Sequence, residues 1–140
     1  MSNTLLNIIT PFKNNSLVEL IKSVENLLAQ KFILIKHIIV CDSSSYLLTK
    51  NYFESNIKAT INYKYLLIVS KKKGIYSSIN QGLDYLDESE PYLILGAGDI
   101  LNVYSNINLD RRINIFNIPY SLSSKKGTLI NKFRPIFMGM

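Results

Sequence analysis

Four short polar segments of this sequence each follow an apolar run and hold residue types that can bind a charged small molecule. They are Thr10-Pro11-Phe12-Lys13-Asn14, Asp42-Ser43-Ser44, Lys73-Gly74 and Gly98-Asp99. A carboxylate such as Asp42 can accept a hydrogen bond from a base N–H, and the ring of Phe12 can stack on that base. Asp99 can hold a divalent cation against a diphosphate. The combination predicts a nucleotide-binding site.

Each of these features also has an ordinary structural explanation. An Asp that follows a strand is often a helix cap or a turn residue, and a lone Phe is more often part of a core. Gly96-Ala97-Gly98-Asp99 can be a simple turn, and Lys71-Lys72-Lys73 a solvated loop. No Walker-type phosphate loop is present, and no Gly-x-Gly-x-x-Gly pattern follows the first apolar run, which disfavours both of those nucleotide-binding folds.

Most other catalytic schemes are excluded by residue counts. The sequence has one cysteine, Cys41, and one histidine, His37. Cys41 cannot form an internal disulfide or build a cysteine zinc site alone, and one histidine cannot supply a multi-histidine metal site. A Ser-His-Asp triad would have to use His37, which stands at the start of an apparent buried strand. Carboxylates with hard metals remain.

The elements that would position the polar segments alternate along the chain. Continuous apolar runs predict strands over 5–9, 37–41, 65–69 and 92–95. Apolar residues at helical spacing predict helices over 17–30, 46–55 (the weakest pattern) and 75–87, with Ser16 and Glu19 as a capping-box pair for the first. Strands without polar alternation are typical of a sheet covered on both faces, so we expect an α/β domain with a mostly parallel sheet.

In such a sheet, ligands bind where the carboxyl ends of the strands meet, and the four polar segments lie at those ends. Beyond Asp99 the pattern loosens. Strands are expected over 114–118 and 128–133, with a turn at 123–127.

Composition supports a single folded domain. The chain has 140 residues, of which 47% are hydrophobic and 19% charged, so it can bury a core. No apolar run approaches the ~18 residues that span a bilayer, and the N-terminus lacks the basic region of a signal peptide. We therefore expect a cytoplasmic protein. The net charge of +6 suits an anionic partner, but the basic residues are not gathered into one tract, and no nucleic-acid recognition motif accompanies them.

Taken in order, four segments resemble the nucleotide-sugar-binding half of family-2-type glycosyltransferases with the GT-A fold. They are Ile8-Ile9-Thr10-Pro11-Phe12-Lys13-Asn14, His37-Ile38-Ile39-Val40-Cys41-Asp42-Ser43-Ser44-Ser45, Lys73-Gly74-Ile75-Tyr76-Ser77-Ser78-Ile79-Asn80-Gln81-Gly82 and Tyr92-Leu93-Ile94-Leu95-Gly96-Ala97-Gly98-Asp99. The third is the most specific, since Lys-Gly-Ile-Tyr-x-x-x-Asn-x-Gly is typical of the family at this place. The resemblance covers about residues 5–102 and implies a Rossmann-like, three-layer GT-A domain.

The resemblance also implies roles for individual residues. Thr10, Pro11 and Phe12 would cradle the base, and Asp42 falls on the carboxylate that contacts it. Lys73, Tyr76 and Asn80 would lie near the ribose and diphosphate. Asp99 matches the last acid of the Asp-x-Asp-like motif that ligates manganese or magnesium. The donor would be a nucleotide sugar, and a UDP-sugar is the first expectation.

The sequence departs from the family in two places. Gly98 stands where an acid usually precedes the metal ligand, and Ser43-Ser44-Ser45 replaces an acid-rich turn. The family's catalytic base comes from the half that follows, and no residue here matches it. We read 5–102 as the donor-binding core of a single domain (1–140) and 103–140 as the start of the acceptor half. The chain is thus expected to be a fragment, or a reduced protein that binds without transferring.

The resemblance predicts a metal-dependent, inverting glycosyltransferase that acts on a glycan or lipid-linked acceptor, in bacterial surface polysaccharide or lipopolysaccharide synthesis. The alternative is a truncated, non-catalytic nucleotide-sugar-binding module. Peripheral association with the inner face of the membrane and self-association as a homo-oligomer stay open, and nucleic acid is the least supported partner.

Overall fold

The computed structural model describes residues 4–13, 17–87, 89–101, 113–123 and 129–139, the last two ranges for their backbone only. Its elements follow one another as β1 (Thr4–Phe12), α1 (Leu17–Leu28), β2 (Ile33–Cys41), α2 (Ser43–Asn56), β3 (Tyr63–Val69), α3 (Ile75–Leu83), β4 (Tyr92–Ile94), β5 (Ile113–Ser123) and β6 (Leu129–Gly139).

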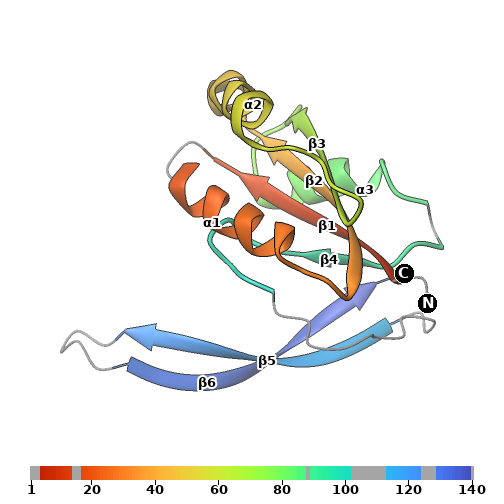
Figure 1. Ribbon diagram of the computed structural model, residues 1–140, viewed down its shortest axis with the longest axis vertical. Coiled ribbons are helices and arrows are strands. Elements are labelled where there is room, and N and C mark those ends of the chain that lie inside the picture. Colours follow the sequence, from red (N-terminus) through yellow and green to blue (C-terminus); the bar gives the residue numbers. More distant parts are fainter. Residues whose placement is uncertain (1–3, 14–16, 88, 102–112, 124–128, 140) are drawn as a thin grey trace.

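One sheet runs through the described residues, in the order β3-β2-β1-β4-β6-β5 (Figure 1). The first four strands are parallel, with Ile8 of β1 opposite His37 of β2 and His37 opposite Tyr65 of β3. β6 joins β4 in antiparallel fashion at the pair Tyr92 and Gly139, and β5 pairs with β6 along its whole length. The predicted α/β class with a mostly parallel sheet is confirmed.

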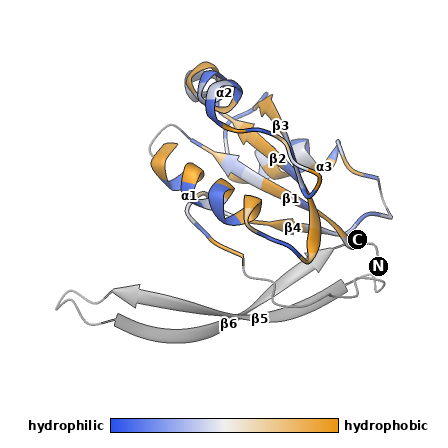
Figure 2. Cartoon of the chain, viewed as in Figure 1, coloured by the Kyte–Doolittle hydropathy of each residue, from blue (hydrophilic) through white to orange (hydrophobic). Residues whose placement is uncertain are grey.

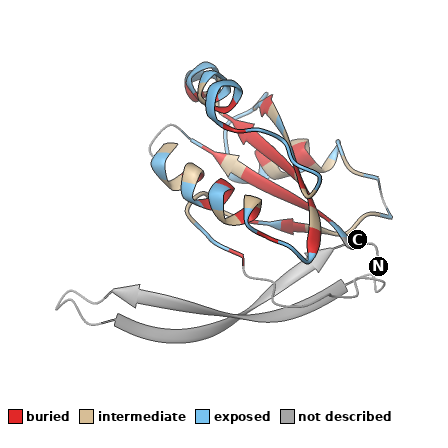
Figure 3. Ribbon diagram, viewed as in Figure 1, coloured by how far each residue is buried: buried red, intermediate tan, exposed pale blue. Residues whose placement is uncertain are grey.

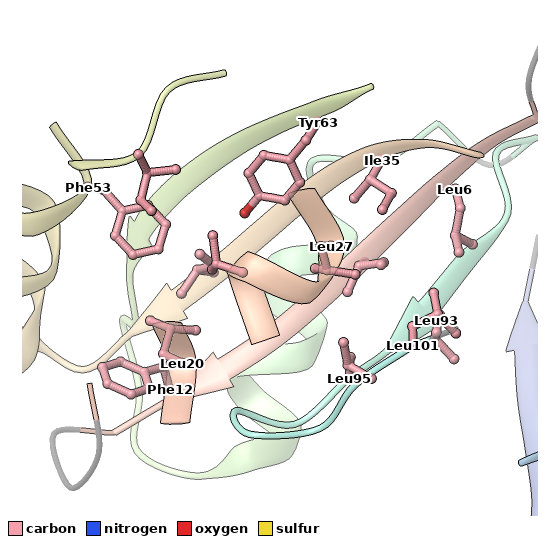
Figure 4. Packing of buried hydrophobic residues seen from close by; sticks show 14 of the residues in the cluster. Leu6, Phe12, Leu20, Leu27, Ile35, Phe53, Tyr63, Leu93, Leu95 and Leu101 are labelled. Carbon is pink, nitrogen blue, oxygen red and sulfur yellow. The ribbon is translucent and has the colours of Figure 1, made fainter. Parts of the chain in front are cut away.

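Helices cover both faces of the parallel part. Buried residues of α1 and the end of α2 pack on one face of the sheet, in a cluster with members such as Leu20, Leu27 and Phe53 (Figure 4). On the other face, Ile9 and Ile38 pack with Leu83 at the end of α3. Hydrophobic residues accordingly line the parallel strands (Figure 2), and the buried positions coincide with them (Figure 3). The result is a three-layer arrangement.

Element ends differ from expectation. β1 continues to Phe12 and β2 begins at Ile33, so both strands are longer than predicted. α3 ends at Leu83, after which Tyr85 and Leu86 form tighter i to i−3 turns instead of helix. β5 and β6 extend well beyond 114–118 and 128–133, whereas most of the turn expected at 123–127 lies outside the described residues, as does Ser16.

α2 confirms the weakest helix prediction and shows why its pattern was weak. Its buried positions Ser45, Thr49 and Phe53 recur every four residues, but two of them are small and polar. Leu47 and Leu48 are 64% and 57% exposed. The helix therefore buries a face that hydropathy does not mark.

Candidate functional site

The carboxyl ends of the parallel strands are linked in space by backbone hydrogen bonds. The N–H of Asp42 donates to the carbonyl of Phe12 at 3.2 Å, and the N–H of Ser70 donates to the carbonyl of Cys41 at 2.7 Å. The polar segments that follow β1, β2 and β3 are thus neighbours along one edge, where the arrowheads of these strands lie (Figure 1). After β4, the Leu95 N–H donates to the Ile9 carbonyl at 3.0 Å and leads the chain into the Gly98-Asp99 segment.

Asp42 stands at the start of α2, and its carboxylate is held by the serines that follow it. The Ser44 hydroxyl donates to Asp42 Oδ2 at 2.8 Å and the Ser45 hydroxyl donates to Oδ1. These bonds, that of Ser45 first, lower the pKa of Asp42 below its ordinary value, so it is ionised at neutral pH. Each oxygen of an ionised carboxylate can accept more than one hydrogen bond, so Asp42 can also accept from a donor such as a base N–H. Ser44 and Ser45 thus orient one acid instead of adding a second.

The segment after β1 is not the loop that the sequence indicated. Thr10, Pro11 and Phe12 belong to β1, because the strand continues beside β2 up to the pair Phe12 and Cys41. Phe12 is 4% exposed and lies in the core cluster (Figure 4), so its ring packs inside rather than offering a face to a base. Of the three residues, Pro11 is the most exposed, at an intermediate level.

Thr10 belongs to a buried chain of polar side chains that crosses three strands. Its hydroxyl bonds His37 Nε2 at 2.7 Å, and His37 Nδ1 bonds the Tyr63 hydroxyl at 2.8 Å. Burial lowers the pKa of His37 to about 3 and raises that of Tyr63, so both are neutral. A neutral imidazole needs one donor and one acceptor, and the two hydroxyls supply both. His37 is therefore a structural residue, near the middle of β2 rather than at its start.

Cys41 is also structural. It is buried at the end of β2, and burial raises the pKa of its thiol to about 12. A thiol in this state is not a nucleophile at neutral pH.

The segment from Lys73 to Gly82 has a physical reason for its glycines. Gly74 has φ +110°, a conformation that side chains disfavour, and it begins α3. A Cβ on Gly82 would lie 2.8 Å from Ile9 Cγ2, so α3 approaches β1 as closely as it does only because residue 82 lacks a side chain. The Gln81 amide links the end of β3 to α3, since it donates to the Val69 carbonyl at 2.6 Å and accepts from the Lys71 N–H at 2.9 Å.

Lys73, Tyr76 and Asn80 were predicted to lie near the ribose and diphosphate. Lys73 precedes α3, Tyr76 and Asn80 belong to it, and all three side chains face solvent. Lys73, Tyr76 and Asn80 are exposed, Tyr76 by 81%. All three side chains are accessible to an anionic ligand, and their contacts with a ribose or diphosphate stay a prediction.

Asp99 closes a tight turn after β4. Its N–H donates to the Gly96 carbonyl at 3.1 Å, and its Oδ2 accepts from the Gly96 N–H at 3.2 Å. Asp99 itself is exposed. Gly98 has φ +90°, and a Cβ there would lie 2.6 Å from Glu19 Oε2 of α1. The positive φ would strain any residue with a side chain at this position, including the acid that the family places there.

Sequence reasoning missed the residues that hold this turn against α1. Ser23, Asn26 and Gln30 bond the backbone of residues 98–101 from positions spaced at i, i+3 and i+7. Ser23 and Asn26 lie on one side of α1, next to its apolar stripe, and Gln30 follows two residues after the helix ends. The signal was present in the sequence as polar residues inside an otherwise buried helix pattern.

The residues present suit a metal that is shared with a nucleotide. Among the residues that the structure describes, no three His, Cys, Asp or Glu side chains come together. Magnesium in nucleotide sites is commonly bound through one or two carboxylates, with phosphate oxygens and waters as the other ligands. The exposed carboxylate of Asp99 can act in this way. In the same described part, no helix is long and apolar enough to cross a membrane.

No family model matches the chain, and no curated protein matches it. Among solved structures, the chain is similar to the mannosyltransferase PcManGT from Pyrobaculum calidifontis in complex with GDP-Man and Mn2+, with a TM-score of 0.54 and 11% sequence identity. The match covers 73% of this chain but 30% of that one, so the chain spans less than a third of that enzyme's length. The likeness shows the fold. This α/β domain is structurally like a GT-A glycosyltransferase.

Proposed function

We propose that this chain carries the nucleotide-sugar-binding part of a glycosyltransferase. The observation that carries the proposal is the coincidence of a GT-A-like sheet with two accessible acids, Asp42 and Asp99, at the carboxyl ends of its parallel strands. Ligands of open α/β sheets bind at this edge. The solved relative is described in complex with GDP-Man and Mn2+, which is the ligand chemistry proposed for this edge.

The residues differ in the part of the donor that they would meet. Asp42, ionised and oriented by its two serines, would accept hydrogen bonds from the base. Lys73, Tyr76 and Asn80 would face the ribose and diphosphate, where a lysine ammonium offsets phosphate charge. Asp99 would hold a manganese or magnesium ion, which when bound neutralises charge on the diphosphate as the nucleotide leaves. Thr10 and Phe12 would support this edge from within, through the buried network and the core.

A second candidate, a nucleotide-sugar-binding module without transferase activity, is favoured by Gly98. Gly98 has φ +90° and carries no carboxylate, so one contact that the family uses is missing. The transferase proposal also includes transfer of the sugar to a glycan or lipid-linked acceptor in surface polysaccharide synthesis. Both candidate functions assign donor binding to residues 5–102.

Calorimetric titration of UDP, GDP and dTDP, with manganese and then with EDTA, tests the proposal. We expect one nucleotide to bind, more tightly with manganese, and Asp99→Asn to remove the manganese enhancement. Asp84→Asn is the matched control, because Asp84 is an exposed acid at the C-terminal end of α3, whereas the proposed ligand residues Lys73 and Tyr76 lie at its N-terminal end. If none of the nucleotides binds with either addition, donor binding is refuted. Release of the nucleotide from a bound donor in the presence of acceptor separates the transferase from the binding module.

A further inference from the structure

The segment that carries Asp99 is held by two side chains of α1, Ser23 and Asn26, and by Gln30, which follows the end of this helix. The Gly98 N–H donates to the Ser23 hydroxyl at 2.8 Å, and that hydroxyl donates to the Asp99 carbonyl at 2.6 Å. One turn further along α1, Asn26 Oδ1 accepts from the Leu101 N–H at 2.8 Å. Gln30, two residues beyond the end of α1, donates from Nε2 to the Leu101 carbonyl at 2.8 Å. We call Ser23, Asn26 and Gln30 the α1 clamp.

Burial makes these bonds matter. Ser23 is 0% exposed and Gln30 8% exposed, and Leu101 adds its side chain to the core cluster (Figure 4). A buried hydroxyl with two backbone partners satisfies both groups, and its removal leaves an N–H and a carbonyl without their partners. The clamp therefore fixes the backbone on both sides of Asp99, while the Asp99 side chain stays exposed.

We propose that Ser23 is a positioning residue for Asp99, so that α1 sets the affinity of the donor site for its divalent cation. This inference rests on the proposed function. A ligand held in place before binding loses less conformational freedom when the ion arrives, and the ion is bound more tightly for that reason. Ser23 acts through the Asp99 backbone and does not touch the ion.

The test compares Ser23→Ala with Val24→Ala in the full chain. Val24 is the adjacent α1 residue, 0% exposed and part of the core cluster, so its truncation costs stability without removing a bond to the 98–101 segment. Manganese is titrated in the presence of the nucleotide that the wild type binds best, and nucleotide affinity is measured again in EDTA. Amide hydrogen exchange at Gly98 and Leu101 reports on the clamp itself.

We expect Ser23→Ala to weaken manganese binding roughly tenfold, which corresponds to ~1.4 kcal/mol, comparable to the net contribution of one hydrogen bond. Nucleotide affinity in EDTA stays at the wild-type value, and Gly98 loses exchange protection while Leu101, bonded to Asn26, keeps it. Val24→Ala retains the manganese affinity despite its lower stability.

Two results overturn the inference: wild-type manganese affinity in Ser23→Ala, or an equal loss in Val24→Ala. If the wild type binds a nucleotide but manganese does not strengthen the binding, the positioning role fails while nucleotide binding at the proposed donor site stands. If no nucleotide binds with manganese or with EDTA, the proposed function fails and the positioning role fails with it. Exchange at Gly98 then still decides whether the clamp exists. The failures of the two proposals are thus separable.

Discussion

The single histidine should make the stability of this fold depend on pH in a defined window. Burial lowers the pKa of His37 from 6.5 to about 3. Between these values the unfolded chain binds a proton that the folded chain does not, so protonation favours unfolding. The free energy of unfolding should therefore be highest above pH 6.5, fall as the pH drops below that value, and level off near pH 3 as far as this group is concerned.

The magnitude follows from the two pKa values. One proton changes the free energy of unfolding by at most about 1.4 kcal/mol per pH unit. With values of 6.5 and about 3, the loss between pH 7 and pH 5 amounts to about 2 kcal/mol. A small domain has a total stability of roughly 5–15 kcal/mol, so this loss is readily measured. Since His37 is the only histidine, no other side chain has an ordinary pKa between pH 5 and pH 7.

Urea denaturation followed by circular dichroism at several pH values between 7 and 5 measures the effect. His37→Gln should remove the dependence. Tyr63→Phe is the matched control, because it deletes the hydroxyl bonded to His37 Nδ1 but leaves the ring buried, so the unfolding free energy drops by about 1 kcal/mol while the slope with pH persists. The imidazole signals in an NMR titration need no assignment. A His37 ring that titrates near pH 6.5, or a stability that is flat from pH 7 to pH 5, would refute the burial argument.

Three further outcomes follow from the glycines and from Asp42. Gly82→Ala should destabilise the fold by about 1–3 kcal/mol, measured by urea denaturation, because its Cβ would meet Ile9 Cγ2 at 2.8 Å; unchanged stability would mean that α3 can shift. Gly98→Ala should lower the free energy of unfolding more than Gly74→Ala does. Both glycines have positive φ, and the backbone strain alone is worth about 1–2 kcal/mol. A Cβ at Gly74 meets open space, whereas one at Gly98 meets Glu19. Glu19→Ala should relieve part of the Gly98→Ala cost, and equal costs at the two glycines would contradict the steric argument. Ser45→Ala should raise the pKa of Asp42 toward its ordinary 3.8, as followed by NMR of the carboxyl carbon, whereas an unchanged value would show that Ser45 does not orient the acid.

Local patterns predicted the parallel strands and the helices between them, but not the end of β1. Thr10-Pro11 suggested a loop because proline cannot donate to a strand ladder. In β1, the Ile9 carbonyl accepts from the N–H of Leu95, directly after β4, and the Phe12 carbonyl accepts from the N–H of Asp42, directly after β2. Successive residues of a parallel strand direct their backbone groups to alternate sides, so Pro11 faces the β4 side. β4 has ended there, at Ile94, and the strand continues without losing a hydrogen bond.

The site was predictable in its acids and not in what holds them. Asp42 and Asp99 each follow an apolar run, which marks them as strand-end residues in any parallel sheet. Thr10 and Phe12 were predicted in a base-binding loop after the first strand, yet both are buried, because β1 continues beside β2 as far as Phe12. A sequence motif does not reveal this burial, because it does not specify how far β1 pairs with β2.

The two acids differ in how far along the chain their partners lie, and this difference has a consequence for function. The Asp42 carboxylate is held by hydroxyls two and three residues away, so its orientation forms with the first turn of α2. Asp99 has a local bond to Gly96, but its backbone is fixed by Ser23, 76 residues earlier in the sequence. That contact exists only when α1 is docked on the sheet and β4 is in place. A change that removes the bond between Ser23 and the Asp99 carbonyl should therefore weaken metal binding and leave the orientation of Asp42 unchanged.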